Sequence, residues 1–217
     1  MTLNELNSIF ANMQEKYGSK TKNAVFGGGK TDNPKYFLVF VNPTARNIAT
    51  DKNWLGIKCQ WLGTKQIWKF LSLVGLFDND LNTKIQNLKP SEWTYDFCCD
   101  VYKNVEKNDV YITNLAKCTQ DTAKPLSDKI FKQYVNLLYE EIKIINPENI
   151  ILFGNQVSSI VLNKKISVSN YRKKFEILTI NNKNFKCFPI FYPVGNGAFN
   201  VSKSIEDLQY IIDNYNN

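Results

Sequence analysis

Four short apolar runs, each ended at once by Asn, Gly or Pro, constrain the fold of this chain more than any other feature. They cover residues 36–41, 110–113, 150–153 and 188–191, and the residues that follow are Asn42-Pro43, Asn114, Gly154-Asn155 and Tyr192-Pro193. A continuous apolar run of this length is typical of a strand that is buried on both faces. Strands of this kind form parallel sheets with helices on both sides.

Helical patterns separate these runs. Apolar residues recur at helical spacing over residues 64–75 and 128–146, and Pro147 ends the second segment. We also expect a short helix after Asn155, a hairpin around Asn181-Asn182 and a closing helix from Ser204. This alternation predicts an α/β fold, a three-layer α/β/α sandwich with a mainly parallel central sheet. Its functional site is then expected where the carboxyl ends of the strands meet.

The length and composition predict one soluble domain over residues 1–217. A helix over residues 1–18 and a basic loop over residues 19–34 are expected as N-terminal extensions. No apolar stretch reaches the roughly 18 residues that a membrane span needs, so we expect no membrane partner. Five cysteines, two of them adjacent at Cys98-Cys99, make a poor disulfide framework. We therefore predict a cytoplasmic protein, and we expect a monomer.

The chain contains no histidine, which excludes Ser-His-Asp triads, Cys-His dyads and metal sites built on imidazole. Catalysis would have to use carboxylates, amides, hydroxyls, lysine or backbone dipoles. The 27 basic and 20 acidic residues give a net charge of +7. This balance favours a polyanionic partner such as nucleic acid, although lysines on solvated faces give the same count.

The motif at residues 24–31, Ala-Val-Phe-Gly-Gly-Gly-Lys-Thr, fits the loose pattern of a phosphate-binding loop. Such a loop needs an apolar strand before it and a helix after it, so that backbone amides converge on the phosphate. Polar residues precede this motif, and Pro34 follows it. A flexible basic loop is therefore the better interpretation.

The segments after the strands carry three motifs in a fixed order. They are Val41-Asn42-Pro43, the run from Tyr111 to Cys118 (Tyr-Ile-Thr-Asn-Leu-Ala-Lys-Cys), and Tyr192-Pro193. In order and spacing they resemble the uracil-DNA glycosylase superfamily over residues 36–200. The first is similar to the Asn-Pro motif of the mismatch-specific and single-strand-selective branches, and the second to the central strand of the iron–sulfur branch. The third stands where that superfamily has its second catalytic motif, usually His-Pro-Ser.

This resemblance implies a role for each motif. Asn42 would hold the attacking water, and Tyr192 or the backbone amides of residues 194–197 would stabilise the departing base. Asn114 would read the Watson–Crick edge of uracil. The remaining expected contacts are the substrate pocket at Pro43, Thr44 and Trp61, with Trp54 as a weaker candidate for stacking, and DNA contacts at Arg46, Lys117, Gly195 and Asn196.

The sequence departs from the superfamily at several positions. Tyr192 replaces the usual His, Val194 replaces Ser, and the glycine that usually follows the first proline is missing. Among the iron–sulfur ligands of that branch only Cys118 has a counterpart, so we expect no metal and no cofactor.

Each candidate residue also has a structural interpretation. Asn42 can open a turn and Asn114 can cap a strand end, while Trp61 and Tyr192 can pack in the core. Arg46 can pair with Asp51 on the surface, and Gly195 to Gly197 can form an ordinary turn. The lysines and arginine at positions 164, 165, 172, 173 and 174 are either solvated charge or one edge of a DNA track.

The function that follows is a monofunctional DNA glycosylase of base excision repair. It would bind DNA and excise uracil or another deaminated base by hydrolysing the N-glycosidic bond. Two alternatives stay open: a non-catalytic nucleic-acid-binding module of the same fold, and an α/β protein that binds a small ligand.

Overall fold

The computed structural model describes residues 1–123 and 126–215, without the side chain of Asn196. Over these residues one six-stranded sheet has the order β1-β3-β2-β4-β6-β5. The strands are β1 (Gly28–Gly29), β2 (Tyr36–Phe40), β3 (Val110–Asn114), β4 (Asn149–Phe153), β5 (Glu176–Ile180) and β6 (Lys183–Ile190). The four middle strands are parallel, and β1 and β5 run antiparallel at the two edges. The predicted mainly parallel sheet is confirmed.

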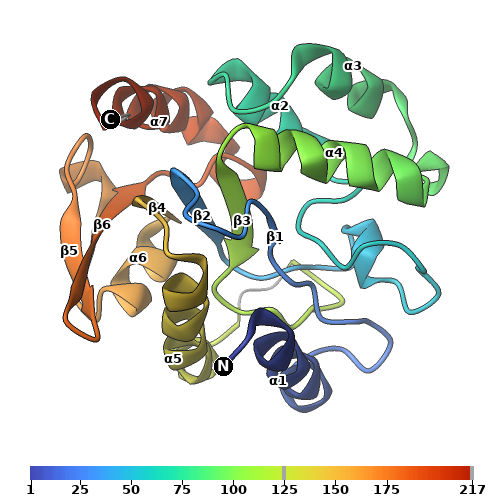
Figure 1. Ribbon diagram of the computed structural model, residues 1–217, viewed down its shortest axis with the longest axis horizontal. Coiled ribbons are helices and arrows are strands. Elements are labelled where there is room, and N and C mark those ends of the chain that lie inside the picture. Colours follow the sequence, from blue (N-terminus) through green and yellow to red (C-terminus); the bar gives the residue numbers. More distant parts are fainter. Residues whose placement is uncertain (124–125, 216–217) are drawn as a thin grey trace.

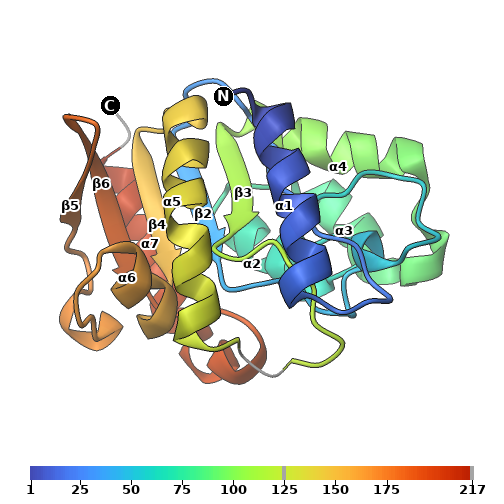
Figure 2. The same ribbon diagram turned by 90° about the horizontal axis from the view of Figure 1, so that it is seen from below.

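Helices cover both faces of the sheet (Figure 1). One layer contains α1 (Leu3–Tyr17), α5 (Asp128–Ile145) and α6 (Asn155–Val161). The other contains α2 (Lys65–Leu73), α3 (Asn79–Asn87), α4 (Tyr95–Lys107) and α7 (Val201–Asn214). Figure 2 shows the first layer in front of the sheet, which confirms the α/β/α sandwich.

Two hydrophobic clusters lie on the two faces of the sheet, and alternate strand residues feed them. Along β2, Leu38 and Phe40 pack toward α2, α4 and α7, whereas Phe37 and Val39 pack toward α1, α5 and α6. Successive side chains of a strand point to opposite faces. Because both faces of β2 are buried, every position is apolar, and this is the origin of the continuous run in the sequence.

Three elements were not expected from the sequence: β1, α3 and α4. The glycine run forms β1, pairs with β3, and leads through a turn to β2 without a helix. A Cβ atom at Gly29 would lie 2.3 Å from the Val110 carbonyl oxygen, so glycine permits this close pairing. The helix α1 is also more than an extension, because Leu6 and Phe10 are fully buried in the cluster that contains α5.

None of the helices in the described ranges is both long enough and apolar enough to cross a membrane.

Candidate active site

The segments that follow β2 and β3 run side by side beyond the end of the sheet. Backbone hydrogen bonds join Leu115 N to Phe40 O (2.8 Å), Ala116 N to Val41 O (3.1 Å) and Gln120 N to Pro43 O (3.2 Å). Asn42 lies within the first segment and Asn114 begins the second. The parallel register of β2 and β3 therefore brings Asn42 and Asn114 to the same carboxyl end of the sheet, as the sequence predicted.

The side chain of Asn42 is half-buried and partly engaged. Its Nδ2 donates to the carbonyl oxygen of Pro43 at 3.0 Å, which holds the amide in one orientation. Among the described residues none donates a hydrogen bond to Asn42 Oδ1. This oxygen can therefore accept a hydrogen bond from a water molecule. Pro43 beside it is buried, and Thr44 pairs with Gln120 in an isolated bridge.

Both polar atoms of the Asn114 side chain are hydrogen-bonded to Gln60, a residue that the sequence did not indicate as part of the site. Its Oδ1 accepts from Gln60 Nε2 at 3.1 Å, and its Nδ2 donates to Gln60 Oε1. Both side chains lie in the interior, each with 1% of its surface exposed. Gln60 lies 54 residues before Asn114 in a loop, and no local pattern in the sequence indicates this contact.

Lys117 differs from its expected role as a phosphate contact. Its side chain is 0% exposed, and its Nζ forms an ion pair with the equally buried Glu141 at 2.5 Å. The same ammonium group donates to the carbonyl oxygen of Asn114. A DNA backbone at the surface cannot reach this position. Lys117 instead fixes the backbone of Asn114 from the interior of the protein.

Glu141 is the centre of this buried network. Its Oε1 accepts from Tyr111 Oη and Thr113 Oγ1, each at 3.0 Å, while its Oε2 faces Lys117. Burial lowers the pKa of Lys117, and the carboxylate of Glu141 opposes this shift. A charged residue on the apolar face of the segment 128–146 was a visible signal for this network, because a buried carboxylate needs partners.

Trp61 lies mostly in the core, with 9% of its surface exposed. Its ring meets the Phe40 ring edge-on at 4.9 Å, and Phe40 in turn stacks on Phe153 at 4.2 Å. This packing fits the structural interpretation, and stacking on a base stays a prediction. Trp68 is fully buried, and its Nε1 donates to the Trp61 carbonyl oxygen at 2.9 Å.

Tyr192 lies half-buried after β6, beside the end of β4. A Cβ atom at Gly154 would lie 3.6 Å from the Tyr192 Cβ, so glycine leaves room for the tyrosine. Its ring meets Phe40 edge-on at 6.0 Å. Burial raises the pKa of Tyr192, so the phenol keeps its proton at neutral pH. In the described part of the chain its hydroxyl has no hydrogen-bond partner, and it is free to donate.

The segment after Tyr192 forms a 3-10 helix, Gly195–Asn200, at the surface. Gly195 adopts a φ of +58°, and Phe199 exposes 94% of its surface. The sequence had pointed to Gly195 and Asn196, and the Asn196 side chain lies outside the described residues. The exposed phenylalanine was not predicted, although its place after a Gly-Asn-Gly turn was visible.

Arg46 is exposed on the loop after β2 and forms no ion pair with any described residue. The alternative pairing with Asp51 is therefore not observed. Asp51 instead accepts from the backbone N of Asn53 at 2.9 Å.

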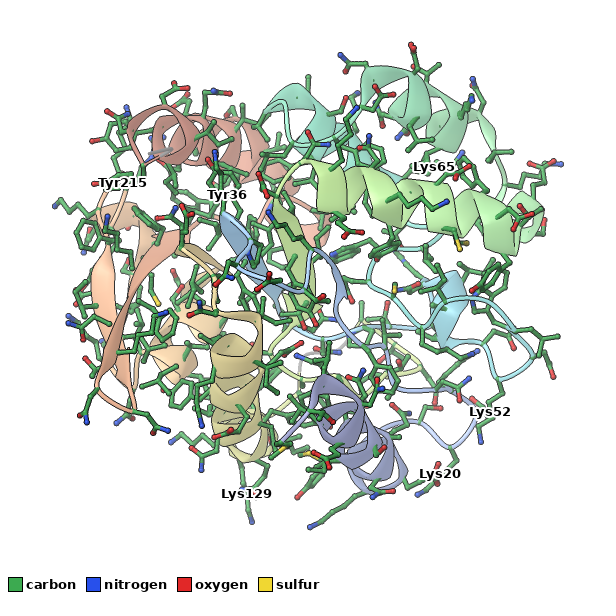
Figure 3. The ribbon with its side chains drawn as sticks, viewed as in Figure 1. Lys20, Tyr36, Lys52, Lys65, Lys129 and Tyr215 are labelled. Atoms are coloured by element: carbon green, nitrogen blue, oxygen red, sulfur yellow. The ribbon has the colours of Figure 1, made fainter. Side chains whose placement is uncertain are left out.

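The basic cluster near α6 is divided between paired and free charges. Lys164 pairs with Glu176, and Arg172 pairs with Glu206 and Asp207. Lys165 lines both a groove of about 670 Å³ between α5 and α6 and a neighbouring groove of about 540 Å³. Elsewhere Lys52 and Lys129 point away from the body of the protein (Figure 3).

The five cysteines are free thiols. Within residues 1–123 and 126–215, no three His, Cys, Asp or Glu side chains gather as metal ligands would.

Comparison with known proteins identifies the family. A family model described as the uracil DNA glycosylase superfamily matches residues 26–208, which include the whole sheet and all the strand ends discussed above. None of the curated protein sequences matches the chain. With most of its length covered by the family model, the chain belongs to the uracil-DNA glycosylase superfamily.

Proposed function

We propose that this protein is a DNA glycosylase that removes uracil or another deaminated base from DNA by hydrolysis, leaving an abasic site. The superfamily membership supports glycosylase chemistry in general. The choice of base and the roles of individual residues are our own proposal, and they rest on the geometry of the strand ends.

Breaking the bond between deoxyribose and uracil produces a cationic sugar and an anionic base. An enzyme for this reaction needs a positioned water and hydrogen-bond donors for the base oxygens. Asn42 Oδ1 would accept a hydrogen bond from the water and orient it. It would not take the proton, because an amide is not basic at neutral pH. Asn114 would pair with the edge of the base, and the Tyr192 phenol would donate to the departing anion.

One observation carries this proposal: amide and phenol groups with free hydrogen-bonding capacity lie at the carboxyl ends of β2 and β6, two parallel strands with β4 between them. Asn42 Oδ1 and the Tyr192 hydroxyl have no partners in the described chain, and both side chains are only half-buried. Both segments adjoin Phe40, since Asn42 follows it by two residues and the Tyr192 ring packs on it. Neither atom is among the fully buried polar atoms without a partner, so both can bind water or a ligand.

The DNA would bind around these strand ends. Arg46 is an exposed cation on the first loop, forms no ion pair with a described residue and suits a phosphate. Phe199 suits the space left by an extruded base, because a ring can stack on the neighbouring bases. Gly195 and Asn196 would let this segment adjust to the duplex.

A non-catalytic nucleic-acid-binding module is the second candidate. The closed amide pair of Gln60 and Asn114 favours it, because the residue expected to read the base already has its partners. The lack of a carboxylate in the first motif points the same way.

Fluorescent oligonucleotides with a single uracil, single- and double-stranded, separate the two candidates after alkaline cleavage of abasic sites. We expect strand breakage by the wild type, and its loss in Asn42→Ala with salt-sensitive DNA binding retained. Asn53→Ala, on the same loop but away from the strand ends, is the control and keeps full activity. Steeply salt-dependent binding without cleavage of any deaminated base would instead establish the binding module.

A further inference from the structure

Gln60 uses the same edge of Asn114 that a base would need. A carboxamide has one edge on which a hydrogen-bond acceptor and a donor stand side by side. On Asn114 that edge faces Gln60, with Oδ1 accepting from Nε2 and Nδ2 donating to Oε1. A base that pairs with Asn114 through two hydrogen bonds therefore cannot bind while Gln60 stays in place.

We infer that Gln60 occupies the place of the base in the free protein and competes with it for Asn114. This inference rests on the proposed function, because it takes Asn114 as the residue that reads the base. The Gln60 amide offers one donor beside one acceptor, and the N3–H and O4 groups of uracil offer the same pair. Gln60 thus imitates the edge of the substrate.

The surroundings of Gln60 permit it to leave. Its only hydrogen bonds within the described residues are the two to Asn114. The chain is anchored on either side, where Phe26 N donates to Lys58 O at 2.9 Å and Ile48 N donates to Leu62 O at 3.1 Å. A movement of Gln60 can therefore stay local and need not unfold the loop.

Trp61, the residue after Gln60, has two unfavourable structural features. Trp61 has a φ of +66°, a left-handed conformation that is uncommon for a bulky side chain. Its Nε1 is buried without a hydrogen-bond partner in the described chain. Both features are unfavourable for the present conformation of this segment, and a ligand that rearranges the segment can relieve them.

Competition of this kind lowers the affinity of every ligand that must displace Gln60 by the same factor. A base that replaces both hydrogen bonds of Gln60 leaves the polar groups of Asn114 paired, and it loses only the free energy of displacing Gln60. A base that replaces only one leaves a buried polar group of Asn114 without a partner, which is costly. Gln60 therefore raises the threshold for every ligand that must displace it.

The test uses free uracil as the probe, titrated by calorimetry into the full-length protein. Gln60→Ala should bind uracil about tenfold more tightly than the wild type, since two hydrogen bonds no longer have to be broken. Gln60→Met, which keeps the length of the side chain without its amide, should also bind more tightly. Gln14→Ala is the matched control, because Gln14 is another buried glutamine whose hydrogen bonds go to Ser19 and Thr119.

Two further arms identify the edge that is used. 3-Methyluracil lacks the N3–H donor, and its affinity should not rise in Gln60→Ala. The double variant Gln60→Ala with Asn114→Ala should lose the gain for uracil. Backbone amide NMR spectra establish that each variant is folded, and Gln60→Met takes the place of Gln60→Ala if the alanine variant is not.

The outcomes separate this inference from the proposed function. Tighter uracil binding by the Gln60 variants supports the inference even if no DNA is cleaved, in which case only the glycosylase proposal fails. Cleavage of uracil-DNA by a wild type whose uracil affinity equals that of both Gln60 variants overturns the inference and leaves the function standing. Absence of uracil binding in every variant also overturns it.

Discussion

The two halves of the candidate site differ in how far their polar groups are already satisfied. The inner half, made of Gln60, Asn114, Lys117 and Glu141, is buried and connected by hydrogen bonds and an ion pair. The outer half, made of Tyr192 and Gly195–Asn200, has a phenol without a partner in the described chain and an exposed phenylalanine. We infer that the half proposed to read the base is already paired in the free protein, whereas the half proposed to meet DNA gains its partners on contact.

The largest expected effect is on stability, when the Lys117–Glu141 ion pair of the inner half is removed. Glu141→Ala leaves the Lys117 ammonium buried without its partner, and we expect a loss of about 3–5 kcal/mol in the free energy of unfolding. Urea denaturation followed by fluorescence measures it. The control, Glu176→Ala, removes the partner of Lys164 in a solvent-exposed ion pair and should leave stability nearly unchanged. Equal losses in the two variants would show that the inner half contributes no special stability.

The next effect concerns chemistry in the outer half. Tyr192→Phe removes only the hydroxyl, and we expect the rate of uracil excision to fall about a hundredfold with DNA affinity and stability retained. Rapid-quench kinetics on a saturating uracil oligonucleotide gives this rate. An unchanged rate would assign the donor role to backbone amides of residues 194–197.

The raised pKa of Tyr192 adds a pH dependence to the same experiment. Burial favours the protonated phenol, so the donor persists as the pH rises through the ordinary tyrosine range near about 10. We therefore expect the wild-type rate to show no loss from this group up to about pH 10. A decline near pH 9 that disappears in Tyr192→Phe would contradict the buried position of the phenol.

A smaller effect should follow from truncating Phe199. We expect Phe199→Ala to reduce excision from double-stranded DNA about tenfold, because the ring no longer fills the gap left by the base. Single-stranded substrate should be affected much less. The control is Leu73→Ala, because Leu73 is also an exposed apolar residue but lies on α2. It should change excision from neither double-stranded nor single-stranded DNA. Equal losses on both substrates would exclude insertion into the duplex.

The smallest effect is expected at the basic grooves beside α6. Lys165→Ala should weaken DNA binding only a few-fold and lower the slope of log affinity against log salt by about 1. Fluorescence anisotropy at several salt concentrations provides the slope. Lys107→Ala, an exposed residue at the end of α4 and so at the amino end of β3, away from the strand ends that form the site, should leave it unchanged. An unchanged slope in Lys165→Ala would mean that the grooves lie away from the DNA.

The sheet could be predicted from sequence because burial on both faces leaves a continuous apolar run. The run at β2, for example, has no polar residue until Asn42. The helix α3 was not predicted, since Ile85 is its only fully buried residue and no apolar stripe marks it. The helix α4 has buried residues at Cys98, Val101 and Val105, a helical spacing that could have been recognised.

The sequence indicated the site residues that directly follow a strand. It did not indicate the contacts that join residues far apart in the chain. Asn42, Asn114 and Tyr192 follow directly from the strand ends. The contacts of Asn114 with Gln60 and of Lys117 with Glu141 join residues that no periodic pattern relates. A lysine that appeared available for phosphate is instead buried, because its carboxylate partner comes from α5. The catalytic roles themselves stay predictions.

The docking of α1 has a consequence for the order of folding during synthesis. Phe10 stacks on Tyr134 at 6.2 Å, and Gln14 Oε1 accepts from Thr119 N at 2.7 Å. These partners leave the ribosome more than a hundred residues after the helix, a delay of several seconds at about 5–20 residues per second. The apolar face of α1 must therefore wait uncovered until α5 has been made, whereas β4, β5 and β6 are synthesised only after that point.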